Sequence, residues 1–125
     1  MTDLINSRFN QPIEAITTAV SPGAALSAAA ALHFVTIGAT EETQYLTLAD
    51  GAAPGERHKL VVISSGPATD LLYVTMTMAG TYEGIRTASG SGSAARFDSF
   101  EVVWDGTYWW PLYVNGGFEI WNNPV

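Results

Sequence analysis

Short runs of alternating apolar and polar residues recur along most of the chain and predict β-strands. In the clearest run, Phe100, Val102 and Trp104 share one face and Ser99 and Glu101 share the other, because successive side chains of a strand point to opposite sides. The runs are rich in β-branched and aromatic residues, which favour strands. The predicted strands span residues 32–37, 44–48, 59–64, 71–78, 83–87, 97–104, 108–114 and 118–121.

The segments between these runs are rich in turn-forming residues. Asp105-Gly106 and Asn115-Gly116 are typical of two-residue type I′ hairpins, whose central residues need positive φ. We therefore expect the last three predicted strands to form an antiparallel meander. Many short strands joined by turns predict an all-β fold, either an antiparallel β-sandwich or a small β-barrel.

Residues 1–25 lack this periodicity and are interrupted by Pro12, Pro22 and Gly23. We interpret them as an extended N-terminal arm preceding a single β-domain at residues 26–125; a frayed terminus is the alternative. Such an arm could become ordered on a partner through apolar anchors. The candidate anchors are Leu4, Ile5, Phe9, Ile13 and Ile16.

Two pieces of this N-terminal region could adopt regular structure. Residues 14–20 (EAITTAV) are compatible with a short strand. The alanine-rich residues 24–32 favour a short helix or a turn before the first predicted strand.

Composition and charge narrow the class of protein. A chain of 125 residues with 47% hydrophobic residues can build one globular core. Its net charge of -7 disfavours binding to nucleic acid, where basic side chains dominate affinity. Residues 24–31 are too short for a bilayer, which needs about 20 apolar residues, and the N-terminus does not resemble a secretory signal. We therefore expect no nucleic-acid partner, no membrane and no export.

Residues able to carry catalysis are few. The chain has no cysteine, so disulfides and thiolate metal sites are excluded, and association between subunits could substitute for them. No nucleophile elbow, phosphate-binding loop or zinc-protease motif occurs. His33 is expected to be solvent-facing or hydrogen-bonded, and His58 lies between Arg57 and Lys59, whose charges disfavour a bound cation. We therefore expect no enzymatic activity, cofactor or metal.

Aromatic residues near the C-terminus form the strongest candidate interaction surface. Trp109 and Trp110 are adjacent, so we expect one in the core and the other on an outer surface or a subunit contact. A sugar-binding platform of stacked rings is a less favoured alternative. The candidate interface or glycan residues are Tyr108, Trp109, Trp110 and Trp121.

Two segments carry a recognisable pattern. Residues 45–62 (YLTLADGAAPGERHKLVV) contain a strand, a small-residue loop, Pro-Gly, a basic residue and a second strand. Residues 100–110 (FEVVWDGTYWW) contain an apolar strand, Trp-Asp-Gly-Thr and an aromatic strand. In this order they resemble small bacteriophage virion β-domain proteins of the capsid decoration (cement) or tail-fibre type. The resemblance covers roughly residues 43–114, and the first 40 residues do not share it.

The resemblance implies an antiparallel β-sandwich or barrel, commonly trimeric, that adds to a virion surface without catalysis. The expected function is therefore that of a decoration protein, which binds the major capsid protein on the outer capsid surface as a homotrimer and stabilises it. Such a protein would be made in the host cytoplasm and reside in the virion. The alternatives are a tail-fibre or baseplate tip domain, or a carbohydrate-binding module that uses exposed Trp and Tyr.

Overall fold

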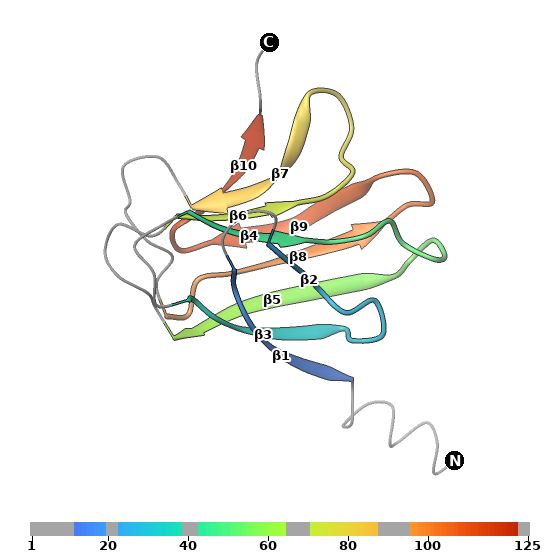
Figure 1. Ribbon diagram of the computed structural model, residues 1–125. Coiled ribbons are helices and arrows are strands. Elements are labelled where there is room, and N and C mark those ends of the chain that lie inside the picture. Colours follow the sequence, from blue (N-terminus) through green and yellow to red (C-terminus); the bar gives the residue numbers. More distant parts are fainter. Residues whose placement is uncertain (1–11, 20–22, 39–42, 65–70, 88–95, 123–125) are drawn as a thin grey trace.

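The computed structural model describes residues 12–19, 23–38, 43–64, 71–87 and 96–122. These residues form two five-stranded β-sheets that pack face to face (Figure 1). The all-β prediction is confirmed, and of its two forms the sandwich is correct and the closed barrel is wrong. Within the described ranges, no helix has the length and apolar character that crossing a membrane requires.

The first sheet has the strand order β1-β3-β5-β8-β9 and the second has β10-β7-β6-β4-β2. All eight strands predicted from the sequence are present as β3 to β10, although the 71–78 run ends earlier, at Thr75. The strands are β1 (Ile13–Thr17), β2 (Ala24–Ala25), β3 (Leu32–Thr36), β4 (Gln44–Thr47), β5 (Arg57–Ser64), β6 (Leu72–Thr75), β7 (Tyr82–Thr87), β8 (Ser99–Trp104), β9 (Trp109–Asn115) and β10 (Phe118–Asn122).

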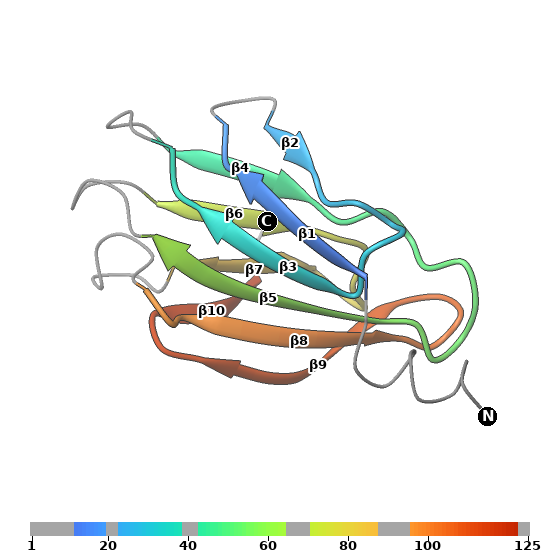
Figure 2. The ribbon, with the colours of Figure 1, turned by 90° about the horizontal axis from the view of Figure 1, so that it is seen from below.

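The first six strands alternate between the two sheets along the chain. As a result β1, β3 and β5 are parallel neighbours in the first sheet, and β2, β4 and β6 are parallel neighbours in the second (Figure 2). A parallel pair needs a long return connection, and here a strand of the opposite sheet supplies it instead of a helix. The prediction of a purely antiparallel sandwich is therefore wrong for this half.

The last four strands complete both sheets with antiparallel pairs. β8 pairs with β5 and β9 pairs with β8, whereas β10 crosses to the second sheet and pairs with β7. The predicted meander is therefore correct for β8 and β9 and wrong for β10. β9 and β10 are edge strands of different sheets, so the chain changes sheets between them. The turn residues Asn115-Gly116 do not distinguish such a crossing from a hairpin within one sheet.

The turn between β8 and β9 differs from the predicted type I′ geometry. Gly106 has a positive φ of 106°, but Asp105 does not belong to the residues with positive φ. Instead, the Asp105 Oδ1 atom accepts hydrogen bonds from the backbone N–H groups of Thr107 (2.7 Å) and Tyr108 (2.8 Å). The side chain of Asp105 thus stabilises a longer loop of the Asx-turn kind.

Part of the predicted arm belongs to the sheets. Ile13–Thr17 forms the edge strand β1, which is the short strand considered for residues 14–20. Within residues 24–32, β2 is followed by a turn at residues 28–29, and no helix forms. Residues 1–11 and 20–22 lie outside the described residues.

The core lies between the sheets and is built from inward-facing apolar residues of both. Phe100, Val102 and Trp104 are buried on one face of β8, as predicted from their alternation. They meet buried residues of the second sheet such as Leu46 and Val74 in one continuous cluster. Trp104 at the end of β8 and Trp109 at the start of β9 both belong to this core.

Candidate functional site

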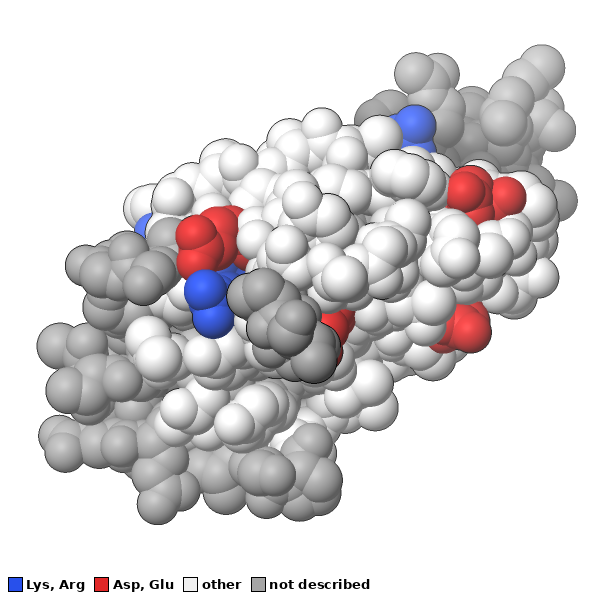
Figure 3. Space-filling view, turned by 90° about the horizontal axis from the view of Figure 1, so that it is seen from above, with Lys and Arg blue, Asp and Glu red and all other residues white. Residues whose placement is uncertain are grey.

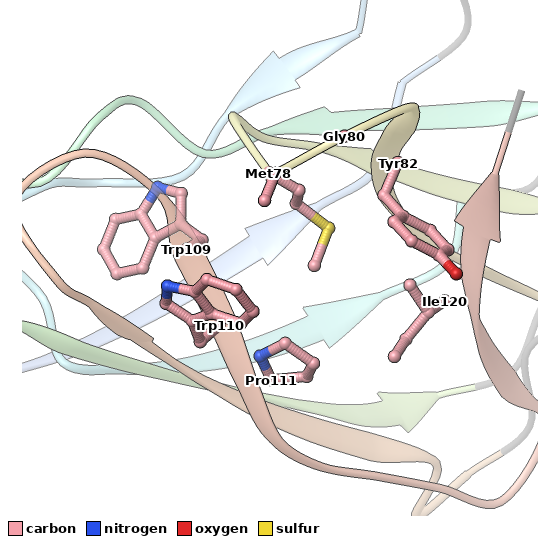
Figure 4. Close-up of a pocket in the computed structure, with 8 residues that line it drawn as sticks. Met78, Gly80, Tyr82, Trp109, Trp110, Pro111 and Ile120 are labelled. Carbon is pink, nitrogen blue, oxygen red and sulfur yellow. The ribbon is translucent and has the colours of Figure 1, made fainter.

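A cleft of about 450 Å³ opens at the end of the sandwich where β9 starts. Its walls come from β9 in the first sheet, from β7 and β10 in the second, and from the segment after β6. Figure 4 shows the Met78 side chain between the two Trp side chains of β9 on one side and the side chains of Tyr82 and Ile120 on the other. The lining residues of this aromatic cleft are Met78, Ala79, Gly80, Tyr82, Trp109, Trp110, Pro111 and Ile120.

Trp109 and Trp110 face opposite sides of β9, as their adjacency predicts. Trp109 is only 1% exposed, whereas Trp110 is 47% exposed. The Trp109 indole N–H donates to the Ala49 carbonyl (3.1 Å), and its backbone N–H donates to the Thr77 carbonyl (2.9 Å). Trp109 therefore ties three segments together as the inner wall of the cleft, and the prediction that one Trp is buried and one exposed is confirmed.

Trp110 forms the outer rim and is held in place by the preceding turn. Its indole N–H donates to the Asp105 Oδ2 atom at 2.6 Å. Hydrogen bonds from the Tyr108 backbone N–H, the Trp110 indole and the Thr107 N–H lower the pKa of Asp105 below its usual value. A ring fixed before binding loses little conformational freedom when a ligand contacts it.

The rest of the rim is apolar and exposed as well. Tyr82 is 46% exposed and Ile120 is 40% exposed. Exposed apolar groups that gather around one hollow are typical of binding surfaces.

The other predicted aromatic residues lie elsewhere. Tyr108 is half-buried in the turn before β9. Trp121 does not line the cleft: its ring lies 4.8 Å from that of Tyr73, and the Arg86 guanidinium lies 5.8 Å from it. Tyr73 also stacks on Tyr45 at 5.7 Å. The four candidates therefore do not form one platform, and only Trp109 and Trp110 share the cleft.

The predicted arm anchors are only partly described. Ile13 is 59% exposed on β1, and Ile16 packs against the core. Leu4, Ile5 and Phe9 lie outside the described residues.

The two histidines are buried in a chain of four hydrogen-bonded side chains, here called the histidine chain: Glu14, His33, His58 and Glu56. The Glu14 Oε1 atom lies 2.7 Å from His33 Nδ1, and His33 Nε2 lies 2.8 Å from His58 Nδ1. His58 Nε2 lies 2.7 Å from Glu56 Oε2. Of the two environments expected for His33, hydrogen-bonded is correct and solvent-facing is wrong.

Parallel pairing brings this chain together. Glu14, His33 and His58 are each the second residue of β1, β3 and β5, and these strands start at the same end of the first sheet. The outer carboxylates also accept backbone N–H groups: Ser27 donates to Glu14 (2.9 Å) and Ala52 donates to Glu56 (2.9 Å). The chain thus links three strands and two loops.

Burial and hydrogen bonding have opposing effects on the pKa values of His33 and Glu56. It lowers the pKa of His33 below the usual 6.5, and the nearby His58 adds to this effect while the hydrogen bond to Glu14 opposes it. Desolvation acts to raise the pKa of Glu56, but hydrogen bonds from the Ala52 N–H and His58 outweigh it, so the net shift is downward.

Glu14 and Glu56 were not singled out by sequence reasoning. His33 has apolar residues on both sides, so alternation alone does not assign it to the inner face. Its partners come from strands far apart in the chain, and no local motif marks them. Across the described residues, no three or more His, Cys, Asp or Glu side chains are arranged so that together they could hold a metal ion.

Comparisons of the chain with protein-family models, with curated proteins and with solved structures find no significant match. What the site can do is therefore inferred from its residues. The aromatic cleft can hold an apolar or aromatic group against fixed indole rings. The imidazoles of His33 (0% exposed) and His58 (2%) are closed to a substrate in this conformation.

Proposed function

We propose that the protein is a non-enzymatic structural protein of a phage virion, a decoration (cement) protein that binds the major capsid protein on the outer capsid surface. The observation that carries the proposal is the aromatic cleft, with its exposed rim of Tyr82, Trp110 and Ile120. Contiguous exposed apolar groups are uncommon on soluble proteins except where they contact a partner. The cleft is therefore the proposed contact with the capsid lattice.

The size and chemistry of the cleft support a protein partner. At about 450 Å³ it is within the range of small-ligand sites and can take one or two apolar side chains of a partner. Tryptophan and tyrosine at such a position are the residues that most often dominate binding energy at protein interfaces. Assembly as a homotrimer is part of the proposal and follows from the resemblance to phage virion proteins.

Charge supports the same class of partner. The net charge of -7 opposes contact with a packaged genome and suits an outward-facing surface. Figure 3 shows one face, on which the few charged side chains of the described residues are scattered among broad uncharged areas. The second segment that resembles phage virion proteins, residues 100–110, ends with the cleft residues Trp109 and Trp110, and the first segment contains Ala49, whose carbonyl accepts the Trp109 indole N–H.

The test measures binding of the full chain to capsids stripped of this protein. Trp110→Ala is expected to weaken binding at least tenfold, because an exposed rim Trp is removed without opening the core. Phe97→Ala is the matched control. Phe97 is also a large exposed aromatic residue (77%), but it lies before the start of β8, whereas the cleft lies beyond the end of β8. Circular dichroism verifies that both variants fold. Equal binding by wild type and Trp110→Ala, or no binding by wild type, would contradict the proposal.

A carbohydrate-binding module is the second candidate. It is favoured by one observation, the half-exposed Trp110 ring that Asp105 holds in a fixed orientation, because flat rings of this kind stack on sugar faces. Glycan-array binding that disappears in Trp110→Ala and persists in Phe97→Ala, without capsid binding, would select this candidate.

A further inference from the structure

The histidine chain uses every ring nitrogen of both imidazoles. Its three hydrogen bonds run in series from Glu14 through His33 and His58 to Glu56. The amino-acid sequence has two histidines, and both belong to this cluster. A neutral imidazole carries one N–H and one acceptor nitrogen, whereas an imidazolium carries two N–H groups.

Proton counting follows from this geometry. Each outer nitrogen donates to a carboxylate, which uses two protons, and the central bond between His33 Nε2 and His58 Nδ1 needs one more. With both carboxylates ionised, the two rings therefore hold three protons and share one positive charge. A fourth proton would place two N–H groups face to face across 2.8 Å, and the central bond would break.

We propose that Glu14, His33, His58 and Glu56 form a proton-dependent latch that closes one end of the first sheet. With three imidazole protons the latch is closed. In mild acid the rings take up the fourth proton, the central bond breaks, and the edge pair β1–β3 loses its side-chain link to β5 and loosens. This inference does not depend on the proposed function.

The position of the break explains why β1 and β3 are released together, since Glu14 keeps its bond to His33. β1 lies at the sheet edge and pairs only with β3. Beyond this backbone pairing, Glu14 connects β1 to His33 and to the Ser27 backbone. On the other side, Glu56 connects His58 to the loop through Ala52. Breaking the middle of the chain separates these two anchored ends.

Other charged groups on the neighbouring elements point away from the latch. Arg57 and Lys59 alternate with His58 on β5 and are exposed on its opposite face. Glu101 of β8 is the cross-strand partner of Lys59 on that same face, and Asp50 is exposed in the loop. The charges that act on His33 are those of Glu14 and His58.

The direction of the pH effect follows from linkage. Unfolded imidazoles titrate near the ordinary pKa of 6.5, so together they hold two protons well above that pH and four well below it. The folded latch holds three. Stability therefore falls as pH rises above about 6.5, because the folded state binds more protons, and also falls below it, because the unfolded state then binds more. The lowered pKa of His33 agrees with the fall in stability at low pH.

The first test measures urea unfolding of the full chain from pH 5 to pH 8.5. Wild type should show a stability maximum near pH 6.5, with the unfolding constant rising on each side by up to about tenfold per pH unit. Glu119→Gln, which removes a half-buried carboxylate that pairs with Arg86 outside the latch, should keep the maximum. His33→Gln should lose it, since only one imidazole remains. A wild-type profile without a maximum, or a maximum retained in His33→Gln, overturns the proposal.

The second test counts protons directly and covers the case in which His33→Gln fails to fold. Nitrogen-15 NMR at pH 6.5 should show three protonated ring nitrogens among the four in wild type. In Glu14→Gln the side-chain amide can donate to His33 Nδ1, so two should remain and the alkaline fall in stability should disappear. Two protonated nitrogens in wild type would overturn the latch.

Hydrogen exchange tests the mechanical consequence. After correction for intrinsic rates, backbone amides of β1 and β3 should exchange at least about tenfold faster at pH 5 than at pH 6.5, while those of the central strand β8 should change little. Equal acceleration of all three strands would show global destabilisation instead of a latch. Unchanged exchange in β1 and β3 would overturn their release.

Discussion

The two halves of the sandwich pair their strands in different ways. In the first half, each strand's neighbour comes from two strands away in the chain, and the pairs are parallel. In the second half, β8 and β9 are joined by a short turn and their pairing is antiparallel. Local turn chemistry is enough to specify the second arrangement, whereas the first depends on contacts between distant residues.

Buried hydrogen bonds between distant residues hold the first half together, and an aromatic pair closes the turn of the second. The histidine chain and the hydrogen bond from Thr18 Oγ1 to Gln44 Oε1 (3.0 Å) both join separate segments of the first half. In the second half, Trp104 and Trp109 pack at 5.1 Å, at the two ends of one turn. Because a buried polar group must find its partner, the polar contacts specify which parallel register is correct.

The largest expected effect lies in the antiparallel half, at Gly84. Its φ is 156°, which side chains rarely adopt, and an added Cβ would collide with the Val74 backbone carbonyl. Gly84→Ala should therefore destabilise the fold by about 2 to 5 kcal/mol, combining backbone strain and overpacking. Urea denaturation measures this loss.

Gly55→Ala is the matched control for that variant. Gly55 also has a positive φ, 94°, but a Cβ there meets open space. Its cost should be only about 1 kcal/mol, from the left-handed backbone alone. Equal losses in the two variants would show that the close approach at Val74 does not matter.

The antiparallel half is also where the sequence was most informative. Alternation predicted the buried face of β8 and the opposite orientations of Trp109 and Trp110, because both follow from the two-residue period of a strand. The crossing of β10 to the second sheet could not be predicted, since turn residues report a change of direction and not which sheet receives the next strand. Ile120 joins the cleft through that crossing.

In the parallel half, the next largest loss of stability is expected from removing the buried hydrogen bonds of Thr18. Its hydroxyl donates to Gln44 Oε1 and accepts the Gly38 backbone N–H at 2.8 Å. Thr18→Val keeps the shape and removes both bonds, so we expect a loss of about 1 to 3 kcal/mol. Thr18→Ser, which keeps the hydroxyl, should lose less. If the two variants have the same urea midpoint shift, the methyl group and not the hydroxyl stabilises this junction.

The parallel half explains why the histidine chain escaped sequence reasoning. His33 and His58 were identified as the only imidazoles, but their relation depends on β3 lying beside β5 with both strands starting at one end. Glu14 enters through β1, within a region whose periodicity predicted an arm. The segments that connect β1 to β3 and β3 to β5 differ in length, so the sequence shows no repeat from which this pairing could be recognised.

The smallest expected effect concerns Asp105, whose side chain joins the β8–β9 turn to the rim of the aromatic cleft. Its pKa is lowered by hydrogen bonds from the Tyr108 N–H, the Trp110 indole and the Thr107 N–H. The stabilisation is therefore complete above the ordinary value of 3.8 and is lost as pH falls through the lower folded pKa. The carboxylate is fully exposed, so solvent weakens the effect.

Asp105→Asn separates the turn from the rim. The Asn carbonyl can still accept the two backbone N–H groups, but its amide nitrogen cannot accept the Trp110 indole. We expect a slightly lower urea midpoint at pH 6, a shallower fall between pH 4 and pH 2.5, and faster motion of Trp110 in fluorescence anisotropy. Asp50→Asn, an exposed carboxylate in another loop, should leave Trp110 unchanged. If Asp105→Asn and wild type lose stability with the same slope in acid, the turn carboxylate does not hold the rim, and the fixed orientation of Trp110 must come from packing on β9 alone.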